Sequence, residues 1–243
     1  MLNPFTSVPK LLHFYFDANS YGKSIPEIKR LREAGDIEGE KKAIQQAQKG
    51  VIDRLAPHLG LTFEVTGEEN IPDDDTTYMV YANHQSFADV FAMMWLFSRH
   101  RQMGYVAKEE WRKYKVLYNA VEYTRSVFLK RGDSRDAVRS IKEVSDLLKQ
   151  GFALVIFPEG TRSQRHEMGE FKAGAFKFAE KGKVPILPIT VDGGYKLFEE
   201  KKTYQPAHVK ITVHPLVHIE EMSKAEQKEA AHQIEATIRS ALD

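Results

Sequence analysis

Residues 134–158 read "SRDAVRSIKEVSDLLKQGFALVIFP", a segment in which the spacing of apolar residues changes at a glycine. Up to Gly151 the apolar residues recur at helical spacing, and a glycine is a common helix stop. Residues 152–158 then form a short, unbroken apolar run, which is typical of a strand buried on both faces. A helix that leads straight into a buried strand indicates an α/β fold.

The chain beyond residue 60 repeats this alternation. Strands are predicted at 61–67, 77–82, 102–108, 126–131, 152–158, 184–191 and 208–219. Helices are predicted at 87–97, 134–151, 170–182 and from Ser223 onward. Such alternation favours an open, mostly parallel central sheet covered by helices.

Residues 1–60 differ from the rest of the chain in their pattern of apolar and charged residues. The apolar, aromatic segment "VPKLLHFYF" at 8–16 precedes charged helical stretches, predicted at about 24–34 and 37–58. We therefore expect a helical element over 1–60 and an α/β domain over 61–243. The start does not read as a secretory signal, and no apolar run reaches the roughly 20 residues that cross a bilayer. If this protein acts on membranes, we expect it to lie on their surface.

Composition narrows the possible chemistry. The 243 residues carry a net charge of only +1, so the overall charge favours neither a nucleic acid nor an anionic surface. The lack of cysteine excludes disulfides, thiolate zinc sites and a cysteine nucleophile, and it fits a reducing cytoplasm. The histidines are scattered, without a helical H-x-x-x-H pair, so we expect no metal.

The stretch "NHQSFAD" at 83–89 follows a predicted strand and pairs a histidine with an aspartate five positions later. On one continuous helix His84 and Asp89 would lie apart around the axis, so contact between them requires a bend. A loop leading into a helix capped by Ser86 supplies such a bend. Asp89 could then fix the tautomer of His84 and leave its second nitrogen as a general base. Asp89 could instead serve only the helix N-terminus, because Ser86 and Asp89 also have the spacing of a capping box.

The stretch "FPEGTRS" at 157–163 also follows a predicted strand and should emerge at the same edge of the sheet. Arg162 offers a planar fork that binds phosphate. Gly160 lets the backbone turn its N–H groups toward an anion, and Thr161 adds a hydroxyl. Glu159 could pair with Arg162 or accept a substrate hydroxyl. The alternative is a polar turn with a solvated arginine, and the stretch lacks the features of a P-loop.

Together these stretches resemble signature blocks of the glycerolphosphate acyltransferase superfamily, in particular its bacterial 1-acyl-sn-glycerol-3-phosphate acyltransferases. The family's HxxxxD block matches at His84 and Asp89, and its EGTR block matches at 159–162. Three further segments resemble the family, namely "AKEE" at 107–110, "FKAGAF" at 171–176 and "VPILP" at 184–188.

The second block of the family departs from its usual pattern here. The segment "RSVFLKR" keeps Phe128 and Arg131 but has Arg125 where the family has a glycine. This departure leaves the acceptor headgroup open. The resemblance extends over about 61–220.

The resemblance implies transfer of a fatty acyl group from a thioester to the sn-2 hydroxyl of lysophosphatidic acid, giving phosphatidic acid. His84, oriented by Asp89, would be the general base. Residues that would bind the acceptor phosphate are Arg131, Glu159, Gly160, Thr161 and Arg162, with Lys108. The donor would be acyl-CoA or an acylated acyl carrier protein, with no cofactor, and the missing cysteine favours direct attack over an acyl-enzyme.

The resemblance also implies a membrane partner and no nucleic acid. Residues 1–60 would dock on the cytoplasmic face of the membrane as a peripheral (monotopic) element, with the aromatic segment in the interface. Two alternatives stay open. One is an acyltransferase that acts on glycerol 3-phosphate or another lysophospholipid. The other is a non-catalytic peripheral lipid-binding protein, which would need the arginines but not a histidine–aspartate dyad.

Overall fold

The computed structural model describes residues 15–17, 19–113, 115–130 and 132–242. Within these residues seven strands form one sheet, in the order β1-β7-β6-β2-β5-β3-β4. They are β1 (Leu61–Thr66), β2 (Met79–Ala82), β3 (Gly104–Lys108), β4 (Val127–Leu129), β5 (Leu154–Ile156), β6 (Ile186–Asp192) and β7 (Ala207–Val213). From β6 to β4 the strands run parallel, whereas β7 is antiparallel to β6 and parallel to β1. The prediction of a mostly parallel sheet is confirmed.

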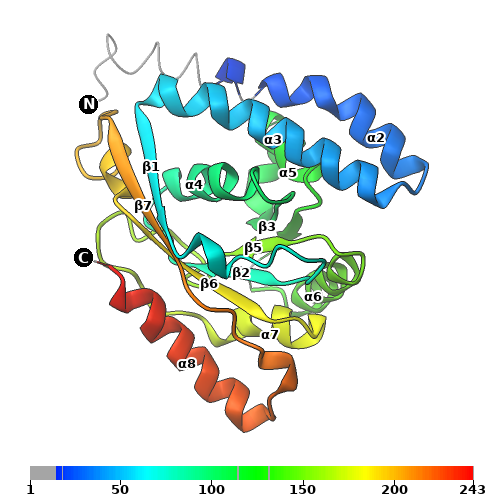
Figure 1. Ribbon diagram of the computed structural model, residues 1–243, viewed down its shortest axis with the longest axis vertical. Helices are drawn as coiled ribbons and strands as arrows, with labels where there is room; N and C mark the ends of the chain where they lie inside the picture. Colours follow the sequence, from blue (N-terminus) through cyan, green and yellow to red (C-terminus); the bar gives the residue numbers. More distant parts are fainter. Residues whose placement is uncertain (1–14, 18, 114, 131, 243) are drawn as a thin grey trace.

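Helices cover both faces of this sheet (Figure 1). Helices α3 and α4 pack together on one face, α6 and α7 pack together on the other, and α8 contacts β6. The helices are α2 (Ile25–Glu33), α3 (Ile37–Leu59), α4 (Ala88–Phe97), α5 (Lys115–Glu122), α6 (Ser134–Lys149), α7 (Ala173–Gly182) and α8 (Lys224–Ser240). Short 3₁₀ turns occur at η1 (Tyr21–Ser24), η2 (Glu68–Asn70), η3 (Glu109–Lys113), η4 (Gly194–Leu197) and η5 (Ile219–Glu221).

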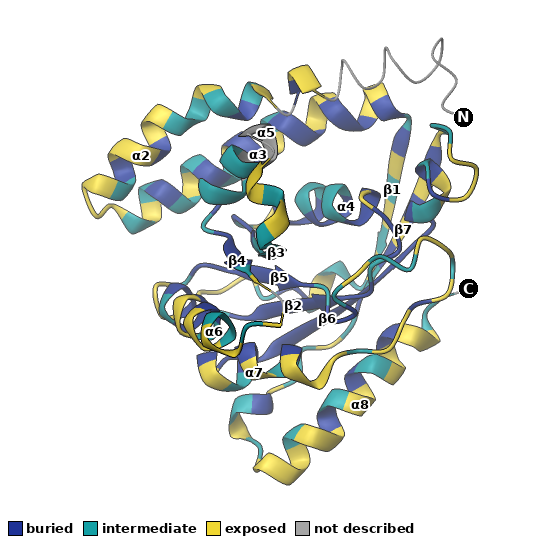
Figure 2. Cartoon of the chain, turned by 180° about the vertical axis from the view of Figure 1, so that it is seen from behind, coloured by how far each residue is buried: buried dark blue, intermediate teal, exposed yellow. Residues whose placement is uncertain are grey.

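The central strand β2 shows why the sheet needs cover on both sides. Successive side chains of a strand point to opposite faces. Met79 and Tyr81 therefore join one apolar cluster while Val80 and Ala82 join the other, and all four are fully buried. Figure 2 shows the central strands buried and the outer helices striped with exposed residues. This pattern explains the unbroken apolar runs at 77–82 and 152–158.

Most predicted elements occur close to their predicted bounds, and the differences have local causes. The strand predicted at 208–219 ends at Val213, and beyond it only Val217 forms an isolated bridge with Ile186. Pro215 lies between them and has no N–H to donate to a ladder. The structure also adds α5, a short helix that the sequence pattern did not indicate.

The N-terminal helices share the core of the α/β domain. Ile44 and Ile52 of α3 are both fully buried, one in each apolar cluster. The division at residue 60 stays a prediction. Among the described residues, no helix combines the length and apolar character needed to cross a bilayer.

Candidate active site

The loops that follow β2 and β5 meet at one edge of the sheet. These strands are parallel neighbours, with Tyr81 opposite Ile156, so their carboxyl ends lie side by side. Beyond them the N–H of Ser163 donates to the carbonyl of His84 over 2.8 Å, and the N–H of Gln164 donates to that of Gln85 over 3.0 Å. The predicted meeting of "NHQSFAD" and "FPEGTRS" is therefore confirmed.

His84 and Asp89 are in direct contact. Nδ1 of His84 lies 2.8 Å from Oδ2 of Asp89, and the Ser86 N–H donates to the same oxygen over 2.7 Å. The Ser86 hydroxyl accepts from the N–H of Ala88, where α4 begins. Asp89 thus serves the helix start and the imidazole at once, and the two readings of the sequence are not exclusive.

The surroundings of His84 leave one ring nitrogen for chemistry. Its ring stacks on Phe157, with centroids 4.1 Å apart, and its side chain is 16% exposed. Because Nδ1 faces Asp89, the second nitrogen, Nε2, is the one that can take a proton from a substrate. Asp89 is fully buried, and this burial raises the pKa of its carboxyl, while hydrogen bonds from His84 and the Ser86 N–H oppose the rise.

The Glu159 carboxylate binds backbone N–H groups and does not pair with Arg162. Its Oε1 accepts from the N–H of His84 over 2.6 Å, and its Oε2 accepts from the N–H of Gly169 over 2.7 Å. Burial raises the pKa of this carboxyl to about 7, against the lowering effect of the two backbone hydrogen bonds. The pairing of Glu159 with Arg162 that the sequence suggested is wrong. Glu159 instead fixes the backbone that carries the histidine.

Arg162 is held by two residues that the sequence analysis did not single out. Its Nη1 lies 2.9 Å from Oε1 of Glu199, and its guanidinium carbon lies 3.8 Å from the ring centroid of Phe87. Glu199 is almost fully buried, and burial raises the pKa of its carboxyl. Glu199 sits in the charged run "FEEKK" at 198–202, which reads as a solvated surface, so no sequence signal marked it.

The other predicted phosphate-binding residues occupy different places. Gly160 has φ +68°, and its N–H donates to the carbonyl of Phe157 within a tight turn. Thr161 is exposed beside it. Lys108 ends β3, a strand that pairs with β5, so it lies at the same sheet edge. Arg131 lies outside the described residues.

The departure at Arg125 has a structural explanation. Its backbone adopts φ +60°, a region that glycine enters easily and other residues rarely enter. Its guanidinium binds both carboxylate oxygens of Glu40, over 2.8 and 2.7 Å, and Nε of Arg32 binds the same buried carboxylate over 2.7 Å. Arg125 thus adopts a backbone conformation that suits glycine better, and its side chain links the start of β4 to the N-terminal helices.

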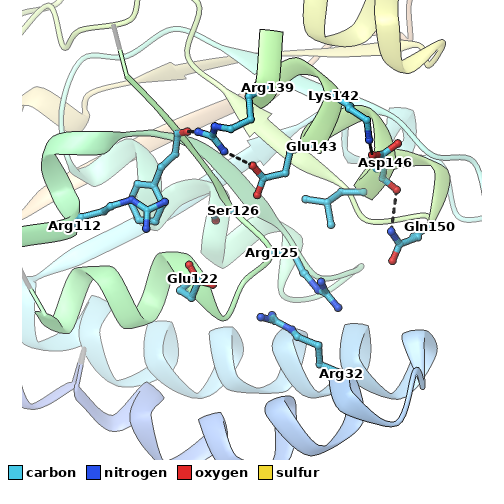
Figure 3. Close-up of a pocket in the computed structure, with 12 residues that line it drawn as sticks. Arg32, Arg112, Glu122, Arg125, Ser126, Arg139, Lys142, Glu143, Asp146 and Gln150 are labelled. Atoms are coloured by element: carbon cyan, nitrogen blue, oxygen red, sulfur yellow. Dashed lines mark hydrogen bonds and ion pairs between the residues drawn. The ribbon is translucent and has the colours of Figure 1, made fainter. Parts of the chain in front are cut away.

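Arg125 also lines a cavity of about 430 Å³, shown in Figure 3. The cavity lies between α2, β4 and α6, and His84, Asp89 and Arg162 are not among its lining residues. Each lining cation has an acidic partner, namely Arg32 and Arg125 with Glu40, Arg112 with Glu109, Arg139 with Glu143, and Lys142 with Asp146. The hollow is charge-compensated, and it shares no lining residue with the His84–Asp89 pair.

A possible metal-binding arrangement lies elsewhere. Within the described part of the chain, His218, Glu220 and Glu221 bring their ligand atoms close together just before α8. His218 already shares a hydrogen bond with Glu220 over 2.9 Å, and exposed acidic groups of this kind are common without an ion. The expectation that catalysis uses no metal stays a prediction.

Comparison with known proteins identifies the family. The family model described as Acyltransferase matches residues 62–192, more than half of the chain. The chain belongs to this acyltransferase family. The match includes His84, Asp89 and Arg162 but ends before Glu199.

Individual acyltransferases agree with this assignment. The chain is 35% identical over 161 residues to a 1-acyl-sn-glycerol-3-phosphate acyltransferase of Chlamydomonas reinhardtii, covering 65% of this chain and 47% of that protein. It is 35% identical over 146 residues to the 1-acyl-sn-glycerol-3-phosphate acyltransferase of Saccharomyces cerevisiae, covering 59% and 49%. The chain therefore spans about half the length of these relatives.

A solved structure matches over nearly the whole chain. It is the crystal structure of the 1-acyl-sn-glycerophosphate acyltransferase PlsC from Thermotoga maritima, with a TM-score of 0.76 and 28% identity. The match covers 97% of this chain and 94% of that one. The α/β architecture and the N-terminal helices that pack on it are thus shared with an acyltransferase of this family.

Proposed function

We propose that this protein is a 1-acyl-sn-glycerol-3-phosphate acyltransferase, which converts lysophosphatidic acid to phosphatidic acid with an acyl thioester. The observation that carries the proposal is the contact of His84 with Asp89 beside the loop of Arg162. A general base and a phosphate-binding group at one sheet edge fit an acceptor that carries both a hydroxyl and a phosphate. The similar proteins named above support the choice of acceptor.

His84 would act as the base in a direct transfer. Its Nε2 takes the proton of the acceptor hydroxyl while the hydroxyl oxygen forms a bond to the thioester carbonyl carbon. The tetrahedral intermediate then collapses, the carbon–sulfur bond breaks, and the imidazolium returns the proton to the departing thiolate. Asp89 stabilises the imidazolium between these steps. The donor would be acyl-CoA or an acylated carrier protein.

Phosphate binding would place the hydroxyl at His84. We assign this role to Arg162, with Lys108 from the end of β3 and Arg131 as further cations. Correct placement of two reacting groups can contribute several orders of magnitude to the rate. Glu159, with both oxygens on backbone N–H groups, supports His84 rather than the phosphate.

The N-terminal element would bring the site to the membrane. We propose peripheral docking on the cytoplasmic face, in which residues 1–60 contact lipid. Tyr15 and Phe16, at the start of the described chain, are 53% and 65% exposed, which suits interfacial insertion. Most of the aromatic segment, up to residue 14, lies outside the described residues.

Docking can be tested without disturbing the core. Asp17 is buried and contacts His58, so substitutions should stop before it. Replacing Tyr15 and Phe16 with serine should weaken cosedimentation with anionic liposomes severalfold, while Val138→Ser, at an exposed apolar residue of α6, should not. Equal cosedimentation of the two variants would contradict docking through this segment.

The function itself is tested by following free thiol release from oleoyl-CoA. We expect release to depend on lysophosphatidic acid and phosphatidic acid to appear in equal amount. A panel containing glycerol 3-phosphate and lysophosphatidylcholine decides between acceptors. Faster turnover of either alternative would overturn the assigned acceptor. Acceptor-independent release, or no release from either oleoyl-CoA or an oleoylated acyl carrier protein, would overturn acyl transfer.

A further inference from the structure

Arg162 is fixed from two sides, and both contacts come from residues without an assigned role in acyl transfer. One is Phe87, which lies within the "NHQSFAD" stretch and is 42% exposed. The other is Glu199, which lies 37 residues from Arg162 and beyond the matched family range. An exposed aromatic residue and a buried acid around one cation call for an explanation.

Phe87 provides a flat surface beneath the guanidinium. The distance of 3.8 Å from the Arg162 guanidinium carbon to the ring centroid is well within the range of a cation–π contact. The Phe87 ring also meets Trp111 of η3 edge to face, with centroids 5.4 Å apart. Trp111 thus supports Phe87, and Phe87 supports Arg162.

Glu199 fixes the orientation of the guanidinium in its plane. Its Oε1 receives Nη1 of Arg162 over 2.9 Å, and the N–H of Phe87 donates to the same oxygen over 3.4 Å. Glu199 therefore binds both the arginine and the loop that carries its aromatic support. An arginine has five N–H donors. Within the described part of the chain the guanidinium uses Nη1 for the ion pair, so its other donors are available to a ligand.

We infer that Phe87 and Glu199 are positioning residues that hold Arg162 ready for the acceptor phosphate. This inference rests on the proposed function. Without them a long, flexible arginine would lose side-chain entropy each time a phosphate bound, which would weaken binding. Their contacts are with Arg162, with each other and with Trp111 rather than with His84, so we expect both to act on acceptor binding and not on proton transfer.

The inference predicts a specific kinetic signature. Phe87→Ala and Glu199→Ala should each raise the KM for lysophosphatidic acid about tenfold and leave kcat within threefold. Phe87→Tyr, which restores an aromatic face, should recover most of the lost affinity. Glu199→Gln keeps an oxygen for Arg162 while removing a negative charge near the phosphate, so its KM should stay near that of wild type or fall below it.

Glu200→Ala is the matched control, because Glu200 is the exposed neighbour of Glu199. Its KM should equal that of wild type. Thermal unfolding of each variant separates loss of positioning from loss of fold. The inference is overturned if Phe87→Ala and Glu199→Ala keep the wild-type KM while Arg162→Ala does not, or if they lower kcat with KM unchanged.

Failure of the proposed function would look different. In that case the wild-type protein itself would not transfer an acyl group to lysophosphatidic acid. Binding of a short-chain lysophosphatidic acid, measured by calorimetry, then tests the inference alone. It predicts weaker binding by Phe87→Ala and Glu199→Ala than by Glu200→Ala, and equal binding by all three would refute it.

Discussion

The two halves of the candidate site are built differently. Around His84, each acidic group is buried and engaged, with Asp89 on the imidazole and Glu159 on the backbone of the same residue. The Arg162 side chain is 27% exposed, and its guanidinium rests on an aromatic ring that is also open to solvent. A base must keep one geometry through every turnover, whereas a phosphate has to enter from outside. We therefore assign chemistry to the closed half and binding to the open half.

The largest effect is expected from the closed half. His84→Ala should lower kcat by about 10³-fold, because a general base typically contributes 10²- to 10⁴-fold. Asp89→Asn should also lower kcat, because the amide favours the wrong tautomer of the imidazole. We expect this fall to be somewhat smaller. Thiol release at saturating lysophosphatidic acid measures both, and His232→Ala, on the exposed face of α8, is the control. Wild-type turnover by His84→Ala would show that His84 is not the general base.

The open half should respond in KM instead. Arg162→Ala removes the fork and should raise the KM for lysophosphatidic acid about 100-fold with a smaller change in kcat. Arg162→Lys should recover only part of this loss, since lysine keeps the charge but not the bidentate geometry. Steady-state kinetics over acceptor concentration provide the measurement. If Arg162→Ala lowered kcat without raising KM, the assignment of binding to the open half would be wrong.

Glu159 tests whether support of the His84 backbone matters for chemistry. Glu159→Gln keeps one acceptor oxygen but leaves His84 or Gly169 without an acceptor for its N–H, so we expect kcat to fall about tenfold with KM nearly constant. A small misplacement of a catalytic group can have such an effect. Glu167→Gln, at an exposed residue of the same loop, is the control. A rise in KM alone would move Glu159 to the binding half.

The raised pKa of Glu159 also predicts a pH dependence of stability. Its pKa rises from 4.5 in the unfolded chain to about 7 in the fold, so the native state binds the proton more tightly. Its contribution is therefore complete below pH 4.5 and is lost as the pH rises through 7. Between pH 4.5 and 8, wild type should lose up to about 3 kcal/mol more unfolding free energy than Glu159→Gln. Denaturant titrations at both pH values measure this, and equal losses would contradict it.

The smallest effect on activity is expected far from both halves. Arg125→Gly removes the bidentate contact with Glu40 but relieves the positive φ, so we expect a loss of about 2 kcal/mol of stability. The kcat should stay near wild type. Arg30→Gln, at an exposed cation of α2 paired with Glu27, controls for charge and should change stability much less. A large fall in kcat for Arg125→Gly would show that the contact between Arg125 and Glu40 affects catalysis at His84.

The meeting of His84, Asp89 and Arg162 was predictable from sequence, whereas the contacts of Glu159 and Glu199 were not. His84, Asp89 and Arg162 follow apolar strands, and parallel strands deliver their carboxyl ends to one edge, so their meeting could be foreseen. Glu199 could not, because an acid in a charged run looks solvated until the fold buries it. The same holds for Glu40, whose partner Arg125 is 85 residues away. The reversal of β1 and β7 also depends on pairing between distant segments, which local periodicity does not encode.

Calorimetric binding of a short-chain lysophosphatidic acid to two single variants tests this division of labour most directly. The account predicts that His84→Ala binds the acceptor as tightly as wild type yet transfers the acyl group about 10³-fold more slowly, while Arg162→Ala binds it about 100-fold more weakly. Equal affinities for the two variants, or a loss of binding confined to His84→Ala, would contradict it.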